Sequence, residues 1–434
     1  MNLDEKLRQL KKAAKAGPQD SNLERQLEYL RRLEECPRKL PAQRAPKGIE
    51  EYVDGRVEKN DWGEFYLARQ ALPFGRPYGK LRIADLASAD LSTLSLVFNN
   101  AVVPEPEKLL YLDTETTGLV GGTGTCAFMI GIGAVEGSQF AVRQFFLRDY
   151  PEEKAALAAL AEALETCEGV VTFNGKTFDV PLLETRYALA RMKSPFGRLV
   201  HLDVLHPARR LWKLRLESCK LTDLESAILG ISREGDVAGS EIPGIYFDYL
   251  RTGNAQGLQP VFFHNALDIV TLAALAAELA RVLSEAGEET IASSLDLFSL
   301  SRILERAQAT ERSLETCRQA LAKCLPQIVE SQALWQLAAQ HKRRRQHDLA
   351  VELWNELARR DAPIAIRALE ELAIHCEHRQ RDAVAALEFT RIALERLRQD
   401  ASLSTHSQRF SRRRERLERK AKQPASSPSP IARD

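Results

Sequence analysis

Hydrophobic and polar positions divide the chain into a middle part, where short apolar runs alternate with helical segments, and a C-terminal part that is helical throughout. Four apolar runs predict strands, at 109–112, 127–135, 140–147 and 170–173. The segment 151–167 predicts a helix, because proline and acidic residues occupy its first turn. Strands that alternate with helices indicate one α/β domain over 108–284.

Beyond residue 290 the pattern contains an internal repeat. The segments "LAAQHKRRRQHDLAVELWNELA" and "LAIHCEHRQRDAVAALEFTRIA" begin at Leu337 and Leu372, an offset of 35 residues. Small residues recur where two helices would approach, and an aromatic residue, Trp354 or Phe389, recurs on the second helix. A period of about 34 residues is typical of tetratricopeptide (TPR)-like helical hairpins, so we expect an all-α helical-repeat region over 290–398. A plain helical bundle is the alternative.

Three further segments surround these two regions. Residues 1–46 predict a charged helical N-terminal arm that ends in a proline-rich linker. Residues 47–107 contain short alternating runs and predict a small β-containing lead-in segment that leans on the next domain. Residues 399–434 are basic and then rich in serine and proline, which predicts a frayed helix followed by a disordered tail.

Charge and cysteine content narrow the class of protein. The chain has 61 Lys plus Arg against 60 Asp plus Glu, so any site for a polyanion must be local. Its seven cysteines form no CxxC pair, which argues against a disulfide framework or a zinc site. The sequence shows neither an apolar signal core nor a membrane-length apolar stretch, and we expect a cytoplasmic protein with reduced thiols.

The stretch "GVVTFNGKTFDVPLL", residues 169–183, places a Gly-Lys-Thr tripeptide directly after an apolar run. A phosphate-binding P-loop would need a glycine five positions before the Gly-Lys pair, where this chain has Val170. The spacing therefore excludes a P-loop. Asn174, Phe178 and Asp179 remain as the candidate functional residues of this stretch.

A pair of carboxylates ends the apolar run in "LLYLDTETTGL", residues 109–119. Asp113 and Glu115 are two positions apart and therefore point to the same face of a strand. Two such anions repel each other unless a cation lies between them, and oxygen ligands suit Mg²⁺ or Mn²⁺. If the strand at 170–173 runs parallel beside this one, Asp179 brings a third carboxylate. A solvated turn is the alternative.

The stretch "VFFHNALDIVTLAALAAELARVL" opens a helical segment at residue 261. His264 and Asp268 are four residues apart and so share one helical face. One of them could bind a metal while the other transfers a proton. A capping or packed histidine is the alternative.

The order Asp-x-Glu, Asn…Asp and His…Asp resembles the three motifs of the DEDD (DnaQ-like) exonuclease superfamily, which has a ribonuclease H-like α/β fold, a mixed sheet flanked by helices. More closely, residues 108–284 resemble the YprB-type ribonuclease H-like domain, including the linking segments "HLDVLHPARRLWKLRLESCKLTDLE" and "IPGIYFDYLRTG", and a TPR-like tail accompanies that family. The resemblance implies hydrolysis of phosphodiesters with two divalent cations, Mg²⁺ or Mn²⁺. The implied metal ligands are Asp113, Glu115, Asp179 and Asp268.

The same resemblance implies that His264 is the general base. His264 and Asp268 are separated by three residues, however, where histidine-type members have four, so this role stays open. Thr114 and Thr116 flank the acids and could contact a terminal nucleotide, while Asn174 and Phe178 could shape its approach.

Other polar residues have two interpretations each. Asp203 could support the site or cap a turn. A basic run could meet a phosphate backbone or form a solvated helix face; its members are Arg209, Arg210, Lys213 and Arg215. The "GGTG" stretch, 121–124, predicts a hairpin turn.

Our hypothesis from the sequence is a metal-dependent 3′→5′ exonuclease that acts on single-stranded RNA or DNA ends, with a helical tail that docks a protein partner or guides the substrate. A non-catalytic nucleic-acid-binding adaptor is the main alternative, and a structure-directed endonuclease is the third. No membrane partner is expected.

Overall fold

The structure is a computed structural model that describes residues 48–99, 101–118, 124–360, 363–399 and 407–422. The expected arm over 1–46 and most of the glycine turn at 121–124 lie outside the described residues. So does the end of the expected tail, 423–434.

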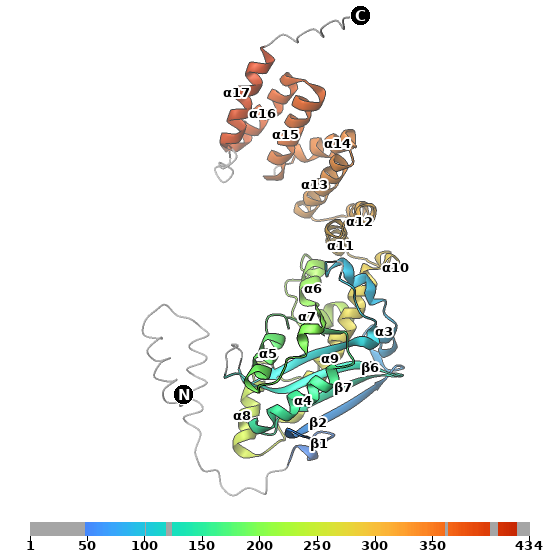
Figure 1. The fold of residues 1–434 in the computed structure, drawn as a ribbon. Coiled ribbons are helices and arrows are strands. Elements are labelled where there is room, and N and C mark those ends of the chain that lie inside the picture. Colours follow the sequence, from blue (N-terminus) through green and yellow to red (C-terminus); the bar gives the residue numbers. More distant parts are fainter. Residues whose placement is uncertain (1–47, 100, 119–123, 361–362, 400–406, 423–434) are drawn as a thin grey trace, which may run out of the picture.

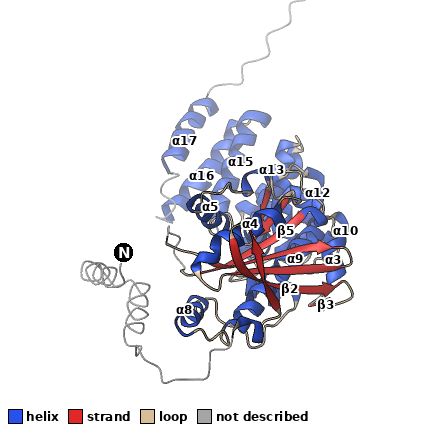
Figure 2. Cartoon of the chain, turned by 60° about the horizontal axis from the view of Figure 1, so that its bottom comes forward, coloured by secondary structure: helices blue, strands red, loops and turns tan. Residues whose placement is uncertain are grey.

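A seven-stranded mixed sheet, in the order β1-β2-β7-β6-β5-β8-β9, forms the centre of the N-terminal part (Figure 2). Its strands are β1 (Gly55–Asn60), β2 (Gly63–Pro73), β5 (Leu109–Thr116), β6 (Ala127–Glu136), β7 (Gln139–Phe146), β8 (Gly169–Thr172) and β9 (Val200–Asp203). Strand β5 pairs antiparallel with β6 and parallel with β8, and β9 is parallel to β8. The mixed sheet flanked by helices confirms the predicted fold class. Strands β5 and β8 are parallel neighbours, which is the arrangement under which Asp179 was expected to bring a third carboxylate to Asp113 and Glu115.

Strands β1 and β2 belong to this same sheet and not to a separate lead-in segment. Strand β2 pairs antiparallel with β7 from Tyr66 opposite Phe146 to Pro73 opposite Gln139. Four consecutive residues of β2, Phe65 to Ala68, are buried. The sheet therefore includes strands from Gly55 onward, whereas the sequence analysis placed the start of the α/β domain at 108. A short β3–β4 ladder, Pro77–Tyr78 with Leu81–Arg82, follows β2.

Alternate residues of β5 face two different helical layers. Leu110 and Leu112 pack in the hydrophobic cluster that contains α4 (Glu153–Leu164) and α5 (Asp179–Leu189). Leu109 and Tyr111 pack in the cluster that contains α9 (Leu258–Leu283). Because strand side chains alternate, Asp113 and Glu115 continue the series that faces α9.

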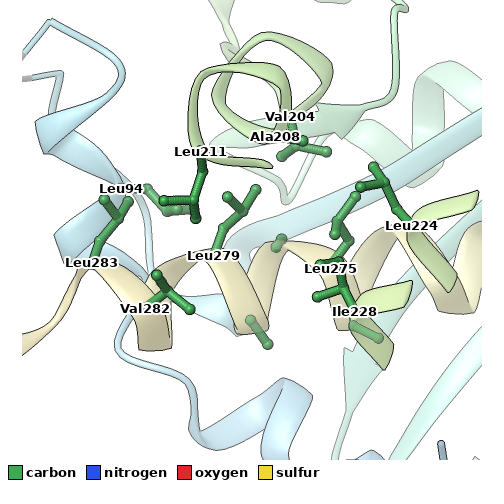
Figure 3. Close-up of a cluster of buried hydrophobic side chains, with 14 of the residues drawn as sticks. Leu94, Val204, Ala208, Leu211, Leu224, Ile228, Leu275, Leu279, Val282 and Leu283 are labelled. Carbon is green, nitrogen blue, oxygen red and sulfur yellow. The ribbon is translucent and has the colours of Figure 1, made fainter. Parts of the chain in front are cut away.

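Helix α9 is fixed by apolar packing along most of its length. Figure 3 shows Leu279 of α9 near Leu211 of α6 (Leu205–Trp212), Leu275 of α9 beside Ile228, and Leu283 beside Leu94. All five of these leucines are buried. This packing holds α9 in place, and the first turns of the helix carry His264 and Asp268.

The remaining helical elements of this part are short. They include α3 (Ile83–Ser88), the 3₁₀ segment η2 (Leu91–Leu96), α7 (Leu221–Leu224), the π-helical segment η6 (Glu225–Leu229), α8 (Ile242–Thr252) and α10 (Glu285–Glu288). Among the described residues, no helix combines the length and the apolar character that crossing a membrane requires.

The C-terminal part is all-α, as predicted, and extends away from the sheet as a series of neighbouring helices (Figure 1). These helices are α11 (Ser294–Arg306), α12 (Thr310–Ala322), α13 (Gln327–Arg343), α14 (His347–Ala358), α15 (Pro363–His375), the π-helical segment η7 (Cys376–Gln380) and α16 (Ala383–Gln399). The two repeated segments fall on the pairs α13–α14 and α15–α16. Ala338 and Ala373, the small residues of the repeat, are completely buried.

A further helix, α17 (Ser407–Ala421), packs on α16 where the sequence predicted a frayed helix and a tail. Phe410 and Leu417 are buried along its inner face. Arg416 and Lys420 approach the buried Glu377 carboxylate at 2.6 and 2.8 Å. The basic residues are therefore partly neutralised by this acid, which explains why a strongly charged segment packs as a helix.

Candidate active site

Asp113 and Glu115 lie at the end of β5, beneath the first turns of α9. The Glu115 side chain is buried, and the Asp113 carboxylate is largely shielded from solvent. Burial raises the pKa of Asp113 well above its ordinary value, and the negative charges of Asp268, Glu115 and Asp179 raise it further. Burial, followed by Asp268 and Asp179, raises the pKa of Glu115 in the same way. The pKa values of Asp113 and Glu115 are therefore raised by the charges of other acids in the predicted set.

Asp179 is the first residue of α5, which follows β8 after a tight turn. The Thr114 hydroxyl donates to Asp179 Oδ1 at 2.5 Å, which joins the end of β5 to the start of α5. Burial raises the pKa of Asp179 to about 6, although the Thr114 hydrogen bond acts in the opposite direction. Thr116 donates to the Gly118 carbonyl at 2.9 Å. Contacts of Thr114 and Thr116 with a nucleotide stay a prediction.

Asp203 stabilises the turn between β8 and α5 by accepting hydrogen bonds from its backbone. Asn174 has a left-handed backbone (φ 68°), and its N–H donates to Asp203 Oδ1 at 2.8 Å. The Lys176 N–H donates to Asp203 Oδ2 at 3.0 Å, and Asp203 is 1% exposed. Asp203 therefore supports the turn that leads to Asp179. Phe178, by contrast, is 52% exposed and stands next to Asp179 in the chain.

A buried amide pair that the sequence analysis missed connects α9 to Asp113. Asn265 Nδ2 donates to Asp113 Oδ2 at 2.9 Å, and Asn265 Oδ1 accepts from Gln144 Nε2 at 2.9 Å. Gln144 also donates to the Phe262 carbonyl at 2.8 Å. Asn265 is a polar residue on the apolar face of α9, and that break in the pattern was the available signal.

Gly131 makes room for this amide. It lies opposite Asp113 in the β5–β6 ladder, and a Cβ at this position would stand 2.1 Å from Asn265 Oδ1. We expect Gly131→Ala to displace Asn265 and to lower the free energy of unfolding by about 1–3 kcal/mol, measured by urea denaturation. Gly197→Ala, whose Cβ meets nothing within 4 Å, is the matched control. Equal stability of the two variants would contradict the tight fit.

An arginine that the sequence analysis also missed enters the site from the loop after η6. The Arg233 guanidinium donates to Glu225 Oε1 at 2.6 Å, to Asp236 Oδ2 at 2.9 Å and to Asp268. The side chains of Arg233 and Glu225 are almost completely buried, at 7% and 2% exposed. Asp268 is thus held by a cation of the protein itself.

Asp236, from the same loop, pairs with His264. His264 Nδ1 lies 2.9 Å from both carboxylate oxygens of Asp236, and His264 Nε2 lies 3.6 Å from Asp268 Oδ2. The predicted shared face of His264 and Asp268 is therefore confirmed. Burial acts to raise the pKa of Asp236, but hydrogen bonds from Arg233 and His264 outweigh it, and the pKa is lowered. Asp236 thus stays ionised beside the imidazole.

The four acids differ in their partners. Within the described ranges, Asp113, Glu115 and Asp179 form no ion pair with a basic side chain, whereas Asp268 pairs with Arg233. Nor does that part of the chain contain a ready-made group of three or more His, Cys, Asp or Glu side chains around one point. The donor set is nevertheless made of oxygen atoms and anionic, which is the chemistry that Mg²⁺ and Mn²⁺ prefer.

The mixed sheet, with acids on β5, α5 and α9, defines a ribonuclease H-like domain. A family model described as the RNase_H superfamily matches residues 110–280. A domain of this superfamily points to nuclease-type chemistry on nucleic acid.

The protein YprB of Bacillus subtilis (strain 168), described as uncharacterized, is similar over a longer stretch. It is 30% identical to this chain over 292 residues, which cover 66% of this chain and 69% of YprB. The chain belongs to the same family as YprB.

Proposed function

We propose that the protein is a metal-dependent 3′→5′ exonuclease of the DEDD type that acts on single-stranded nucleic acid. The observation that carries this proposal is the group of shielded acids at the end of β5 and the start of α5. Burial raises the pKa of all three, the charges of Glu115 and Asp179 raise the pKa of Asp113 further, and the charge of Asp179 raises that of Glu115. None of the three forms an ion pair with a basic side chain among the described residues. Buried acids that repel one another are costly to a fold and are typical of sites that bind cations.

Asp113, Glu115 and Asp179 would hold divalent cations, joined by Asp268 when Arg233 releases it. Such ions, when bound, supply an activated water and charge stabilisation for phosphodiester hydrolysis. Asn265 fixes one carboxylate oxygen of Asp113, and Thr114 fixes one of Asp179. These two hydrogen bonds preorient the carboxylates before any ion arrives.

His264 is suited to accept a proton in this reaction. Asp236 engages Nδ1 of the imidazole, which leaves Nε2 directed toward the acids. A carboxylate that orients a histidine in this way fixes the tautomer and stabilises the protonated ring. This arrangement supports His264 as the general base despite the unusual spacing to Asp268.

Two exposed aromatic side chains are suited to stack on nucleobases. Phe178 precedes Asp179, and Phe263 precedes His264; each is 52% exposed. Stacking on aromatic rings is tolerant of sequence and requires unpaired bases, which favours a single strand as the substrate. Thr114, Thr116 and Asn174 complete the proposed contacts with the terminal nucleotide. The TPR-like helices would dock a protein partner.

One observation favours the adaptor alternative. Arg233 already neutralises Asp268 from within the protein. If it stays there, the site would be short of one acid for hydrolysis and would bind nucleic acid without cutting it.

The proposal is tested with 5′-labelled linear single strands of RNA and DNA in Mg²⁺, Mn²⁺ or EDTA. A ladder that shortens from the 3′ end only with metal is the expected result. A circular single strand of the same sequence is the matched control, because it has no end and must stay intact. Cutting of the circle would point to the endonuclease, and binding of the strands without products would point to the adaptor.

The role of Asp236 can be tested separately. Asp236→Asn should keep the side-chain shape but remove the charge that stabilises protonated His264, so we expect kcat to fall by about 10²–10⁴-fold. The Kd for the strand should change little. Steady-state kinetics and fluorescence anisotropy separate the two effects. A fall in binding with normal kcat would show that Asp236 does not act through His264.

A further inference from the structure

A pocket of about 370 Å³ opens beside the turn that Asp203 braces. The residues that give it its chemical character are Lys176, His201, His206 and Arg210, with the Phe98 ring on one wall. It lies beside β9, between that strand, α6 and the segment that carries Val97 and Phe98. The proposed function assigns no role to this pocket.

The pocket is cationic. Lys176 and Arg210 are exposed, and neither forms an ion pair with any acid in the part of the chain that the structure describes. Lys176 Nζ lies 6.0 Å from the centre of the Phe98 ring, and Arg210 donates to the Val97 carbonyl at 3.4 Å. Both contacts leave donor groups of the two cations available to an anion.

The other polar groups of the pocket do not cancel this charge. Asp203 is the one acid in the lining, and its two oxygens accept the backbone N–H groups of Asn174, Lys176 and Leu205. His201 lies 2.8 Å from the Thr172 hydroxyl. Burial and the nearby Lys176 charge lower the pKa of His201 to about 4, so this ring is neutral.

The four cations of the basic run at 209–215 do not all belong to the pocket. Arg215 is occupied by Asp296 of α11, at 2.8 Å, and Lys213 donates to the Glu217 carbonyl. Arg209 is exposed but does not line the pocket. Of the four cations, Arg210 alone belongs to the pocket, where Lys176 from the β8–α5 turn joins it.

The pocket and the acids lie at the same end of the parallel strands. Asp203, the last residue of β9, lines the pocket, and Asp113 lies near the end of β5. Strands β5, β8 and β9 are parallel neighbours, so β9 ends roughly 10 Å across the sheet from β5. A strand with its reacting phosphate at the acids would reach the pocket with a nearby nucleotide.

We propose that this pocket binds a backbone phosphodiester of the nucleic acid strand, away from the scissile phosphate, through Lys176 and Arg210. The inference rests on the proposed function, since it assumes that a strand enters at the acids. Phosphate contacts of this kind fix the position of the strand without selecting a base sequence. The pocket would thus hold the strand in register while its end is processed.

Binding of a fluorescein-labelled single-stranded DNA is measured by anisotropy at several salt concentrations, with Ca²⁺ in place of Mg²⁺ and with gels that verify intact DNA. Each phosphate neutralised on a single strand contributes about 0.7 to the slope of log K against log salt. The double variant Lys176→Gln/Arg210→Gln should therefore lose about 1.4 of that slope and bind roughly tenfold more weakly at low salt.

Arg209→Gln, which removes a neighbouring charge on the same helix, is the control and should keep both the slope and the activity. Lys176→Arg/Arg210→Lys should retain the wild-type slope, which would show that charge and not fold explains the loss. An unchanged slope in the glutamine double variant, or equal losses in Arg209→Gln, would overturn the proposal. A loss of slope in a protein that never hydrolyses DNA would support the pocket and reject the exonuclease function.

Discussion

Asp113→Asn is expected to reduce metal-dependent hydrolysis at least about a thousandfold while making the metal-free protein more stable to heat. The loss of activity follows because the carboxylate would bind a cation, and charge stabilisation by such an ion contributes several kcal/mol to the reaction. The gain in stability follows because the pKa of Asp113 is raised by burial and by its acidic neighbours. Asparagine can still accept the Asn265 hydrogen bond.

The gain in stability of Asp113→Asn over wild type should change with pH in a definite direction. A carboxyl group whose pKa is raised by folding contributes stability below its unfolded pKa, and the contribution is lost as the pH rises through the folded pKa. The difference in melting temperature between Asp113→Asn and wild type should therefore grow from about pH 4 toward neutral pH.

Differential scanning calorimetry in EDTA measures this difference. Glu184→Gln, which changes an exposed acid of α5, is the matched control and should change neither activity nor stability. A variant that is inactive and also less stable than wild type would mean that Asp113 supports the fold and not a cation.

Arg233→Met is expected to lower the free energy of unfolding by about 3–5 kcal/mol, because it leaves the buried Glu225 without its counter-charge. Glu225 would keep a hydrogen bond from Thr271, which is too little to replace a guanidinium. Urea denaturation measures the loss. The double variant Arg233→Met/Glu225→Gln should recover a large part of it, since the unpaired charge is then gone. If the loss in the double variant equals the sum of the losses in Arg233→Met and in Glu225→Gln, the two residues are not coupled.

The double variant Arg233→Met/Glu225→Gln also tests whether the site binds a metal ion. Removing Arg233 frees Asp268, so the Mn²⁺-dependent rise in melting temperature of the double variant should exceed that of wild type. No rise in either protein would favour the adaptor. The measurement is independent of catalysis.

The sequence predicted the central strands and the acids because their patterns are local. Strand β5 is a continuous apolar run, and a period of two puts Asp113 and Glu115 on one side. A helical period does the same for His264 and Asp268. The parallel pairing of β5 with β8 stayed a condition in the sequence analysis, because a strand–helix–strand order allows parallel strands but does not name the neighbour.

What the sequence did not predict depends on contacts between distant segments. Arg233 and Asp236 lie in a polar loop without periodicity, so nothing in the pattern directs them to Asp268 and His264. Strand β2 finds its partner in β7, more than sixty residues later, and a local pattern reports burial but not the pairing partner. Strand β9 spans only four residues and mixes apolar with polar side chains, so it forms neither the continuous apolar run that revealed β8 nor a recognisable period.

The ion pair between Arg215 and Asp296 has a mechanical consequence. It joins the segment after α6, beside the proposed phosphate pocket, to the first helix of the C-terminal series. In that series α17 contacts α16, which contacts α15, so a load or a bound partner at the far end acts on the sheet domain only through successive interfaces. Tension or torsion applied to the helices would therefore reach the sheet domain through two helices: α11, which pairs with Arg215 after α6, and α12, whose Arg312 donates to the Leu283 carbonyl of α9.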